Sequence, residues 1–500
     1  MIPRTFSAFQ YGIHGKIAHI EAAGQPLPPQ IQITGLAAEV VKESRERIRV
    51  ALGQLGFDIP RQKIIVHLSP ANSRKEGSQF DLPIALAVLS AEGCLGAPLL
   101  ARTGFLGELG LNGQVRRVRN IIPLILAMRT REDIDAIYVP EGNAEEVSLL
   151  GQHKIRIVRT LAETIECLNG KVPVRVPSDK PHWAPELWAN SIDDIVGNEI
   201  AKRALEIALA GRHHLLLIGS PGVGKSMLAG AAPSLLPPLL ESELVELAVI
   251  QNATNENWRP TLTRPFRSPH HSVSANGFVG GGSGQIIPGE LSLAHRGILF
   301  LDEFPEFRRD ALEGLREPLQ TGEIHIHRLG HSHTLPARFI LLAAMNPCPC
   351  GQALSLMKRC SCNREKVIAY RKKISGPIVD RMDLGVVMAG IPSERGRTQT
   401  ECEVKNRIEQ AWNIQFQRYG EGCWNGDASV NDPAAFELSQ PVQTLFKHIV
   451  DTKLPSMRMR HKLLRVSRTI ADLEGSAVLE TKHLEEAWAL RCPDLHALNM

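Results

Sequence analysis

The chain has 500 residues, more than one hydrophobic core usually organises, so we expect about three domains. With 43% hydrophobic and 22% charged residues, its composition is that of a soluble globular protein. The net formal charge of +4 gives no argument for nucleic-acid binding, which would need a local basic surface.

No signal peptide is seen at the start and no apolar run is long enough to span a bilayer, so we expect a cytoplasmic protein with no membrane partner.

Residues 1–170 are predicted to form an α/β domain. Ile64–Leu68 indicates a strand and Leu82–Leu89 a buried helix. Four prolines between residues 173 and 185 oppose regular structure, so residues 171–190 are predicted to be an extended linker.

The next segment, residues 191–392, contains a phosphate-binding motif. The apolar run Leu215–Ile218 predicts a buried strand, and Met227–Ala231 can start a helix. Between them lies a complete P-loop, Gly219-Ser220-Pro221-Gly222-Val223-Gly224-Lys225-Ser226. Its backbone N–H groups can surround phosphate oxygens, Lys225 can reach the β- and γ-phosphates, and Ser226 can bind Mg²⁺. We therefore predict that the chain binds ATP and Mg²⁺.

Two further strands are predicted to end in polar side chains of a hydrolysis site. Gly297–Leu301 is followed by Asp302 and Glu303, the Walker B pattern. Asp302 would hold Mg²⁺, and Glu303 would polarise the attacking water. Alone, the pattern fits equally well an apolar strand that reaches solvent; beside a P-loop it indicates ATP hydrolysis. A second apolar strand ends at Asn346, which can hold the same water in the sensor-1 role.

Arg381 follows a short predicted helix within Ser375–Asp383. An arginine supplied in trans to a γ-phosphate can raise the rate of hydrolysis by about 10³–10⁵. A local salt bridge with Asp380 or Asp383 would also explain its presence.

Residues 393–500 are predicted to be mostly helical, because residues 404–412 and 463–471 carry helical spacing. Arg458 begins a basic helix, and its position at the helix start could bring it to a phosphate. A solvated basic face explains most of the other basic residues of that helix.

Four of the nine cysteines lie close together in two Cys-x-Cys pairs, which are Cys348, Cys350, Cys360 and Cys362. Cysteines used in this way fit a reducing compartment better than a disulfide framework. Four thiolates can hold a structural Zn²⁺, although the pairs are more tightly spaced than the common Cys-x₂-Cys. Unliganded thiols and an iron–sulfur cluster or redox pair remain as alternatives.

In this order, the P-loop, Asp-Glu, Asn, Arg381 and the late arginine helix resemble an AAA+ ATPase. Four segments match more closely the ComM/YifB family of magnesium-chelatase-like AAA+ proteins, and these are Arg267–Ser272, Pro288–Gly297, Ala344–Gly351 and Arg468–Leu473. The resemblance covers essentially the whole chain. It implies a homohexameric ring with nucleotide between protomers, Arg381 as arginine finger and Arg458 as the sensor-2 arginine.

The resemblance also implies the fold: an N-terminal Lon-protease-like (ribosomal-S5-type) α/β domain, a central AAA+ α/β sandwich with pore insertions, and a C-terminal helical lid. Arg74–Asp81 and Gly104–Val115 are similar to the proteolytic domain of Lon. The position of the nucleophile holds Gln79 and that of the lysine holds Ile122, and neither can perform the chemistry. We expect a scaffold without peptidase activity, with Ser78 as a shifted nucleophile the alternative.

Two insertions of the family point into the ring's pore. In the first, residues 272–288, Phe278 is expected to be an exposed aromatic that stacks on a base. The second, Gly322–Thr334, predicts a β-hairpin turning near residues 329–330, where Arg328 could contact phosphates. His325 and His327 share a strand face, so a metal site is an alternative to a solvated hairpin.

The resemblance implies a DNA motor that promotes branch migration of recombination intermediates during natural transformation. Its partners would be single-stranded and branched DNA and recombination proteins. The alternatives are the ATPase motor of a metal-chelatase-like complex and a protein-remodelling unfoldase.

Overall fold

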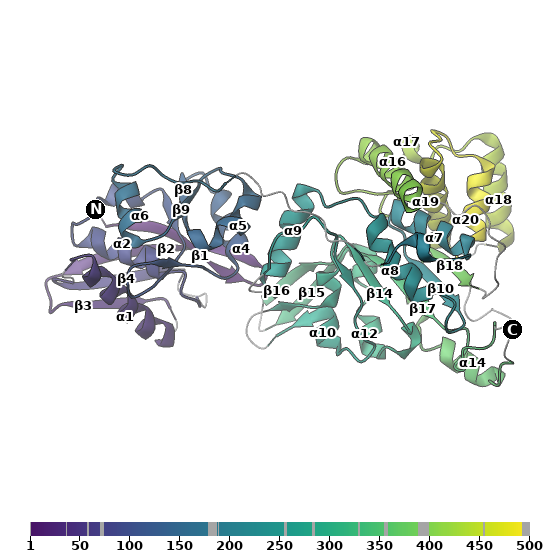
Figure 1. Ribbon diagram of the computed structural model, residues 1–500, viewed down its shortest axis with the longest axis horizontal. Helices are drawn as coiled ribbons and strands as arrows, with labels where there is room; N and C mark the ends of the chain where they lie inside the picture. The colour runs from purple at the N-terminus through teal and green to yellow at the C-terminus, as the bar shows by residue number, and fades with distance from the viewer. Residues whose placement is uncertain are drawn as a thin grey trace. The chain divides into compact units, whose positions relative to one another are not determined.

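The computed structural model describes residues 2–36, 38–57, 60–70, 75–178, 188, 190–254, 258–282, 286–328, 331–354, 359–388, 400–453 and 456–492. The chain divides into two compact units (Figure 1). Unit 1 comprises Met1–Ala184, Leu240–Thr261 and Gly282–Ile287, and unit 2 comprises Pro185–Leu239, Leu262–Gly281 and Pro288–Met500. Within the described ranges, none of the helices has the length and apolarity that a bilayer crossing requires.

Unit 1 is built on a mixed seven-stranded sheet. In spatial order its strands are β3 (Gln30–Thr34), β4 (Lys63–Ser69), β2 (His14–Gln25), β1 (Arg4–Tyr11), β5 (Thr103–Phe105), β8 (Ala136–Pro140) and β9 (Ile155–Val158). The pairs β1–β2 and β2–β4 are antiparallel, and the other pairs are parallel. The predicted strand at residues 64–68 lies within β4.

Helices and one short hairpin complete unit 1. They are α1 (Ala38–Gln54), α2 (Asp81–Ala91), α3 (Ala97–Leu100), α4 (Ile121–Arg129), α5 (Ala144–Val147), α6 (Leu161–Leu168), α9 (Glu241–Asn252), β6 (Glu108–Leu109) and β7 (Val115–Arg116). The predicted helix at residues 82–89 lies in α2, which is buried along nearly its whole length because its residues are apolar all round. In the predicted linker, residues 171–178, 188 and 190 are described. Arg175 bridges to Ile157 of β9 and pairs with Glu141 and Glu163.

Unit 2 is built on a five-stranded sheet in which all pairs are parallel, consistent with the expected AAA+ core. Its spatial order is β11 (Phe266–Arg267), β14 (Ile298–Leu301), β17 (Ile340–Met345), β10 (Leu215–Gly219) and β18 (Leu384–Met388). The three central strands are fully buried, which explains their continuous apolar sequences. Because parallel strands end at the same edge, the residues after β10, β14 and β17 lie side by side.

Several helices and short strands flank this sheet. They are α7 (Glu199–Gly211), α8 (Lys225–Leu235), α10 (Ala275–Val279), β12 (Gly280–Gly281), α11 (Glu290–Leu293), α12 (Arg309–Glu313), α13 (Pro318–Thr321), β15 (Glu323–Arg328), β16 (His331–Pro336), α14 (Arg364–Arg371) and α15 (Gly376–Val379). A further short strand, β13 (Ile287–Pro288), falls at the boundary of the two units.

The last part of unit 2 is helical, as Figure 1 shows in green and yellow. It contains α16 (Glu401–Tyr419), α17 (Pro433–Phe436), α18 (Gln440–Lys453), α19 (Met457–Leu473) and α20 (Thr481–Ala489). The segments predicted to be helical at residues 404–412 and 463–471 lie in α16 and α19. Both helices pack on α7, and one hydrophobic core joins them to the parallel sheet.

Candidate functional site

The P-loop joins β10 to α8, as its sequence context predicts. Gly222 and Gly224 have φ values of 82° and 93°, in the left-handed region where a side chain would be strained. Helix α8 begins at Lys225, immediately after the loop. The glycines therefore let the chain turn into a helix whose N-terminal N–H groups face the loop.

The side chain of Lys225 is held inside this loop. Its Nζ donates hydrogen bonds to the carbonyl oxygens of Gly219 (2.6 Å) and Ser220 (3.0 Å) and to Oδ1 of Asn346 (3.2 Å). Burial lowers the pKa of Lys225, and nearby Asp302 opposes that shift. The structure thus brings the predicted sensor residue at the end of β17 into direct contact with the P-loop lysine.

Two oxygen donors converge beside Lys225. Ser226 Oγ donates a 2.7 Å hydrogen bond to Oδ2 of Asp302, which directly follows β14. Hydroxyl and carboxylate oxygens are the ligands that Mg²⁺ prefers, so these two residues fit the expected metal. They belong to a pocket of about 360 Å³ lined by the P-loop, Asp302, Glu303 and Asn346, which we call the P-loop pocket.

Glu303 lines the P-loop pocket and has an unusual backbone conformation. Its φ of 50° is in the left-handed region, which is rare for a residue with a side chain and recurs at functional sites. Its side chain is 57% exposed, and Oε2 lies 3.3 Å from Nδ1 of His271. A carboxylate that reaches solvent in this way can orient a water molecule.

Sequence reasoning assigned no role to His271. It was part of a segment matched to the family, but nothing in the pattern connects it with Glu303. The contact arises because β11 lies next to β14 in the sheet, so the residues after both strands meet. Only the strand order could have predicted it.

Arg381 and Arg458 line a different pocket. It has a volume of about 480 Å³, and its basic lining residues are Arg212, Arg338, Arg381, Arg458, Lys462 and Arg465. We call it the arginine pocket. Among the described residues that line the P-loop pocket, neither Arg381 nor Arg458 appears. Each arginine that the sequence associates with the γ-phosphate therefore lies away from this chain's own P-loop.

Local contacts hold both arginines in place. Arg381 donates to Oε1 of Gln320 and to the Pro377 carbonyl, each at 2.7 Å, whereas Asp380 pairs with Arg458 at 2.6 Å. The local salt bridge considered for Arg381 is thus formed by Arg458 instead. Burial lowers the pKa of Arg381, and so does the positive charge of Arg458. The pocket concentrates positive charge that a phosphate would neutralise.

Helix α19 fixes the loop that carries Arg381. Lys462 Nζ donates to the carbonyl oxygens of Asp380 (2.5 Å) and Met382 (2.6 Å). On the other side, the backbone N–H of His214 donates to Asp383 at 2.9 Å. The loop is therefore bonded to α19 and to the start of β10. Because Arg458 belongs to α19, the same helix supports both arginines.

The structure corrects one predicted DNA contact. Phe278 was expected to be exposed, but its ring is fully buried and lies 6.1 Å from that of Phe307. The prediction is wrong because residues 275–279 fold into the short helix α10, capped by Ser274, which turns the apolar ring away from water.

The second insertion forms the expected hairpin. Strands β15 and β16 pair antiparallel, and Arg328 lies opposite His331 at the last pair. The side chain of Arg328 and the turn at residues 329–330 lie outside the described residues, so that predicted contact is not located. His325 and His327 are both exposed, and His325 pairs with Glu317 at 2.5 Å. In the described part of the chain, the group with the spacing of a metal site is the cysteine cluster.

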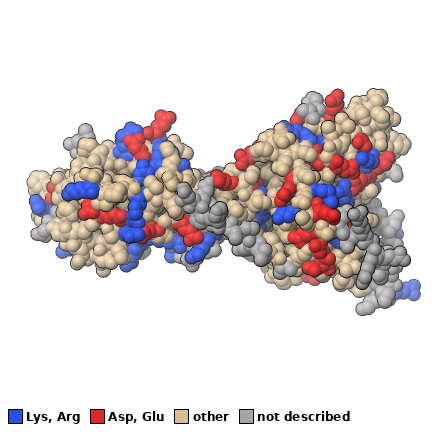
Figure 2. Space-filling view, turned by 45° about the horizontal axis from the view of Figure 1, so that its top comes forward, with Lys and Arg blue, Asp and Glu red and all other residues tan. Residues whose placement is uncertain are grey.

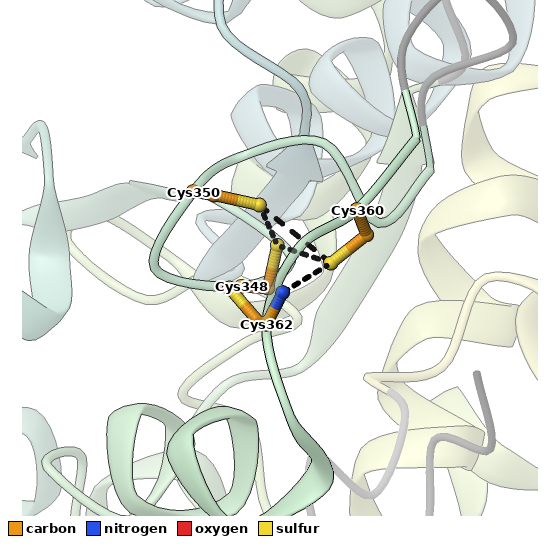
Figure 3. A group of neighbouring side chains, drawn as sticks. All are labelled: Cys348, Cys350, Cys360 and Cys362. Atoms are coloured by element: carbon orange, nitrogen blue, oxygen red, sulfur yellow. Dashed lines mark hydrogen bonds between the residues drawn. The ribbon is translucent and has the colours of Figure 1, made fainter.

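All four predicted cysteines come together. Their Sγ atoms lie within 4.8 Å of one another (Figure 3).

The structure also locates the three residues of unit 1 that the comparison with Lon singles out. Gln79 is buried and donates to the Glu76 carbonyl at 3.0 Å, and Ile122 is buried in α4. Ser78 donates to the carboxylate of Glu108.

Comparison with known proteins identifies the family. Models described as "Magnesium chelatase, subunit ChlI", "Subunit ChlI of Mg-chelatase" and "Magnesium chelatase, subunit ChlI C-terminal" match residues 191–395, 20–143 and 398–491. The chain is 38% identical to competence protein ComM of Haemophilus influenzae, over 97% of both chains. The chain belongs to the ComM/YifB family of magnesium-chelatase-like proteins.

Other relatives of this ComM/YifB chain extend the comparison. It is 38% identical to the uncharacterised protein YifB of Escherichia coli, over 93% of this chain and 92% of the relative. Human DNA helicase MCM8 is 25% identical over 42% of this chain and 23% of the helicase. The magnesium-chelatase family is ATPase-like, which implies ATP and Mg²⁺ as cofactors.

Proposed function

We propose that this protein is an ATPase whose working form is a hexameric ring, with each nucleotide bound between two copies. The observation that carries the proposal is the separation of the P-loop pocket from the arginine pocket within one chain. A γ-phosphate at Lys225 has the lysine, the Mg²⁺ ligands and Glu303 nearby but lacks an arginine. A second copy that presents Arg381 and Arg458 to that phosphate completes the site.

Each residue then has a defined task. Lys225 binds the β- and γ-phosphates, and Asn346, already bonded to Lys225, holds the attacking water together with Glu303. Ser226 and Asp302 would hold Mg²⁺, which would neutralise charge at the phosphates. The neighbour's Arg381 stabilises the negative charge that develops on the transferred group, and Arg458 assists it.

His271 acts in this scheme as a positioning residue. Its 3.3 Å contact with Glu303 restrains a carboxylate that is otherwise 57% exposed and free to adopt other rotamers. Holding the carboxylate in one orientation favours a single position for the attacking water. The left-handed backbone conformation of Glu303, with a φ of 50°, is a further constraint on this residue.

The ring is further proposed to act on DNA, promoting branch migration of recombination intermediates during natural transformation. Two relatives support this proposal: one is named a competence protein and another a DNA helicase. On the face drawn in Figure 2, described basic and acidic side chains are interspersed over both units. DNA contacts would therefore be local, and the β15–β16 hairpin, which presents exposed His325 and His327, is the proposed element.

The domain layout follows the same proposal. Residues 1–170 would be a Lon-like domain without peptidase activity, since Gln79 and Ile122 replace the residues that proteolysis needs. Residues 171–190 would be the linker, residues 191–392 the AAA+ core and residues 393–500 the helical lid.

The proposal is tested with a labelled four-way DNA junction. Wild-type protein is expected to hydrolyse ATP faster with the junction present and to convert it to product. Lys225→Ala and Glu303→Gln should abolish both activities, because the first removes the phosphate contact and the second the water-positioning carboxylate. Hydrolysis that ignores DNA would refute the DNA motor and favour a protein client, as in a chelatase-like complex. Steep salt dependence of DNA binding would support phosphate contacts.

A further inference from the structure

The four clustered cysteines lie on a loop that directly follows the sensor strand. Cys348 is two residues beyond Asn346, and Cys362 immediately precedes Asn363, the N-cap of α14. Cys348 is fully buried, and the other three are partly buried. They are drawn from both ends of one loop, and Figure 3 shows their sulfur atoms turned toward a common centre. The segment between Gly351 and Arg359 has no periodic apolar pattern by which it could fold alone, so hydrophobic packing does not by itself explain why four thiols meet.

The distances among three of the sulfur atoms fit one tetrahedral metal ion, and the sulfur of Cys362 lies within 4.8 Å of each of them. Cys348 Sγ lies 3.4 Å from Cys350 Sγ and 3.7 Å from Cys360 Sγ, and the last two are 3.6 Å apart. A tetrahedral site with Zn–S bonds of about 2.3 Å places its sulfurs about 3.8 Å apart. A disulfide would need about 2.05 Å, and a cubane iron–sulfur cluster, which binds each thiolate to a different iron, would need wider spacing.

Backbone N–H groups also point at these sulfurs. The N–H of Cys362 donates to Cys360 Sγ at 3.4 Å, and the N–H groups of Gln352 and Ser361 donate to Cys350 Sγ. Such bonds stabilise thiolates and orient them, as the outer contacts of metal sites do. We propose that Cys348, Cys350, Cys360 and Cys362 bind one structural Zn²⁺ that fixes the loop against the P-loop.

The second half of this proposal rests on contacts of the same loop. A methyl group added at Gly351 would lie 2.6 Å from Cδ of Pro221, so the loop touches the P-loop with no space between them. Arg371 of α14 donates to the Pro347 carbonyl at 3.3 Å, and the Tyr370 hydroxyl accepts the N–H of Asn346. Zinc would tie both ends of the loop together and thereby hold Asn346 and Pro221 in place.

Metal content tests the first half without any use of DNA. Purified wild-type protein, analysed for metals, is expected to contain about one zinc per chain. Cys360→Ser and Cys362→Ser should lose it, whereas serine at the exposed Cys94 and Cys402 should not. If a variant does not fold, wild-type protein answers the same question: its metal is removed with a chelator and Co²⁺ is added. The absorption of a tetrahedral cobalt–thiolate site is then expected. Stoichiometric iron, or metal-free folded protein that binds no Co²⁺, would overturn the proposal.

A glycine pair tests the contact with the P-loop. Gly351→Ala should keep its zinc but lower ATP hydrolysis about tenfold or more, since the new methyl group displaces Pro221. Gly420→Ala is the matched control: its φ of 80° resembles the 75° of Gly351, yet no atom lies within 4 Å of its added methyl group. Equal activities in the two variants would show that the loop does not support the P-loop. Neither result depends on whether the ATPase acts on DNA.

Discussion

The P-loop pocket and the arginine pocket lie in the same unit but are built differently. In the first, each charged group already faces a partner: Lys225 faces backbone carbonyls and Asn346, and Asp302 faces Ser226. The second gathers several cations, and burial together with the charge of Arg458 lowers the pKa of Arg381. Under the proposed function, the first pocket binds a nucleotide and the second assists one bound by a neighbouring copy. On that proposal, one chain holds two unlike halves of a site.

Of the variants considered, Arg381→Ala should lower the rate of ATP hydrolysis most. If the arginine pocket serves a neighbour's phosphate, kcat for ATP hydrolysis should fall by about 10³-fold or more, while ATP affinity changes little. Steady-state hydrolysis and nucleotide-binding measurements on the same protein separate the two. Arg102→Ala removes an exposed arginine paired with Asp135 and should leave both unchanged. Full activity of Arg381→Ala would remove the arginine pocket from the mechanism.

Glu303→Gln should stop hydrolysis at the P-loop pocket. The carboxamide keeps the shape of the side chain but cannot accept a proton, so hydrolysis should fall by about 10²–10⁴-fold. ATP should remain bound, because Lys225 and the Mg²⁺ ligands are intact. Retention of a bound nucleotide after gel filtration checks this expectation. A variant that hydrolyses ATP normally would show that another group orients the water.

His271→Ala should have a smaller effect, about tenfold on kcat with KM unchanged, because only the orientation of Glu303 is lost. His271→Asn keeps a hydrogen-bond donor near the carboxylate and is expected to recover part of the rate. A change in KM with kcat preserved would place His271 in nucleotide binding instead.

The smallest predicted effect is the change of stability with pH caused by His213, which contacts helix α19 behind the arginine pocket. His213 Nε2 lies 2.8 Å from the Thr469 hydroxyl of α19, and burial lowers the pKa of His213 to about 4, with Asp383 opposing. The unfolded chain therefore binds more protons between about pH 6.5 and 4, so stability falls as pH falls through that range, by about 3 kcal/mol at most. The melting temperature of wild type should drop more from pH 7 to 5 than that of His213→Gln. The exposed His153→Gln should behave as wild type; equal drops in all three would exclude His213 as the cause.

Much of the P-loop pocket could be predicted from the sequence because its parts are contiguous motifs at strand ends. The strands before Gly219, Asp302 and Asn346 are apolar and buried throughout, so their positions and the meeting of their ends follow from composition and parallel pairing. The cysteine cluster was equally accessible, since all four residues fall within one short segment.

The rest depends on tertiary structure. His271 meets Glu303 only because of strand order, and Phe278 is buried by the turn of a five-residue helix that residue type does not reveal. Helix α9 packs with α4 in unit 1 although it lies in sequence between two strands of the unit 2 sheet. Local pattern cannot show to which core a helix of mixed character will attach.

Mixing two inactive variants tests the shared site most directly. Lys225→Ala retains its arginine pocket, and Arg381→Ala retains its P-loop pocket. In a randomly mixed ring, about a quarter of the interfaces would pair an intact P-loop with an intact arginine. The account predicts that an equal mixture of the two proteins hydrolyses ATP far above either one alone. Mixed rings that assemble but remain as inactive as their parents would contradict it.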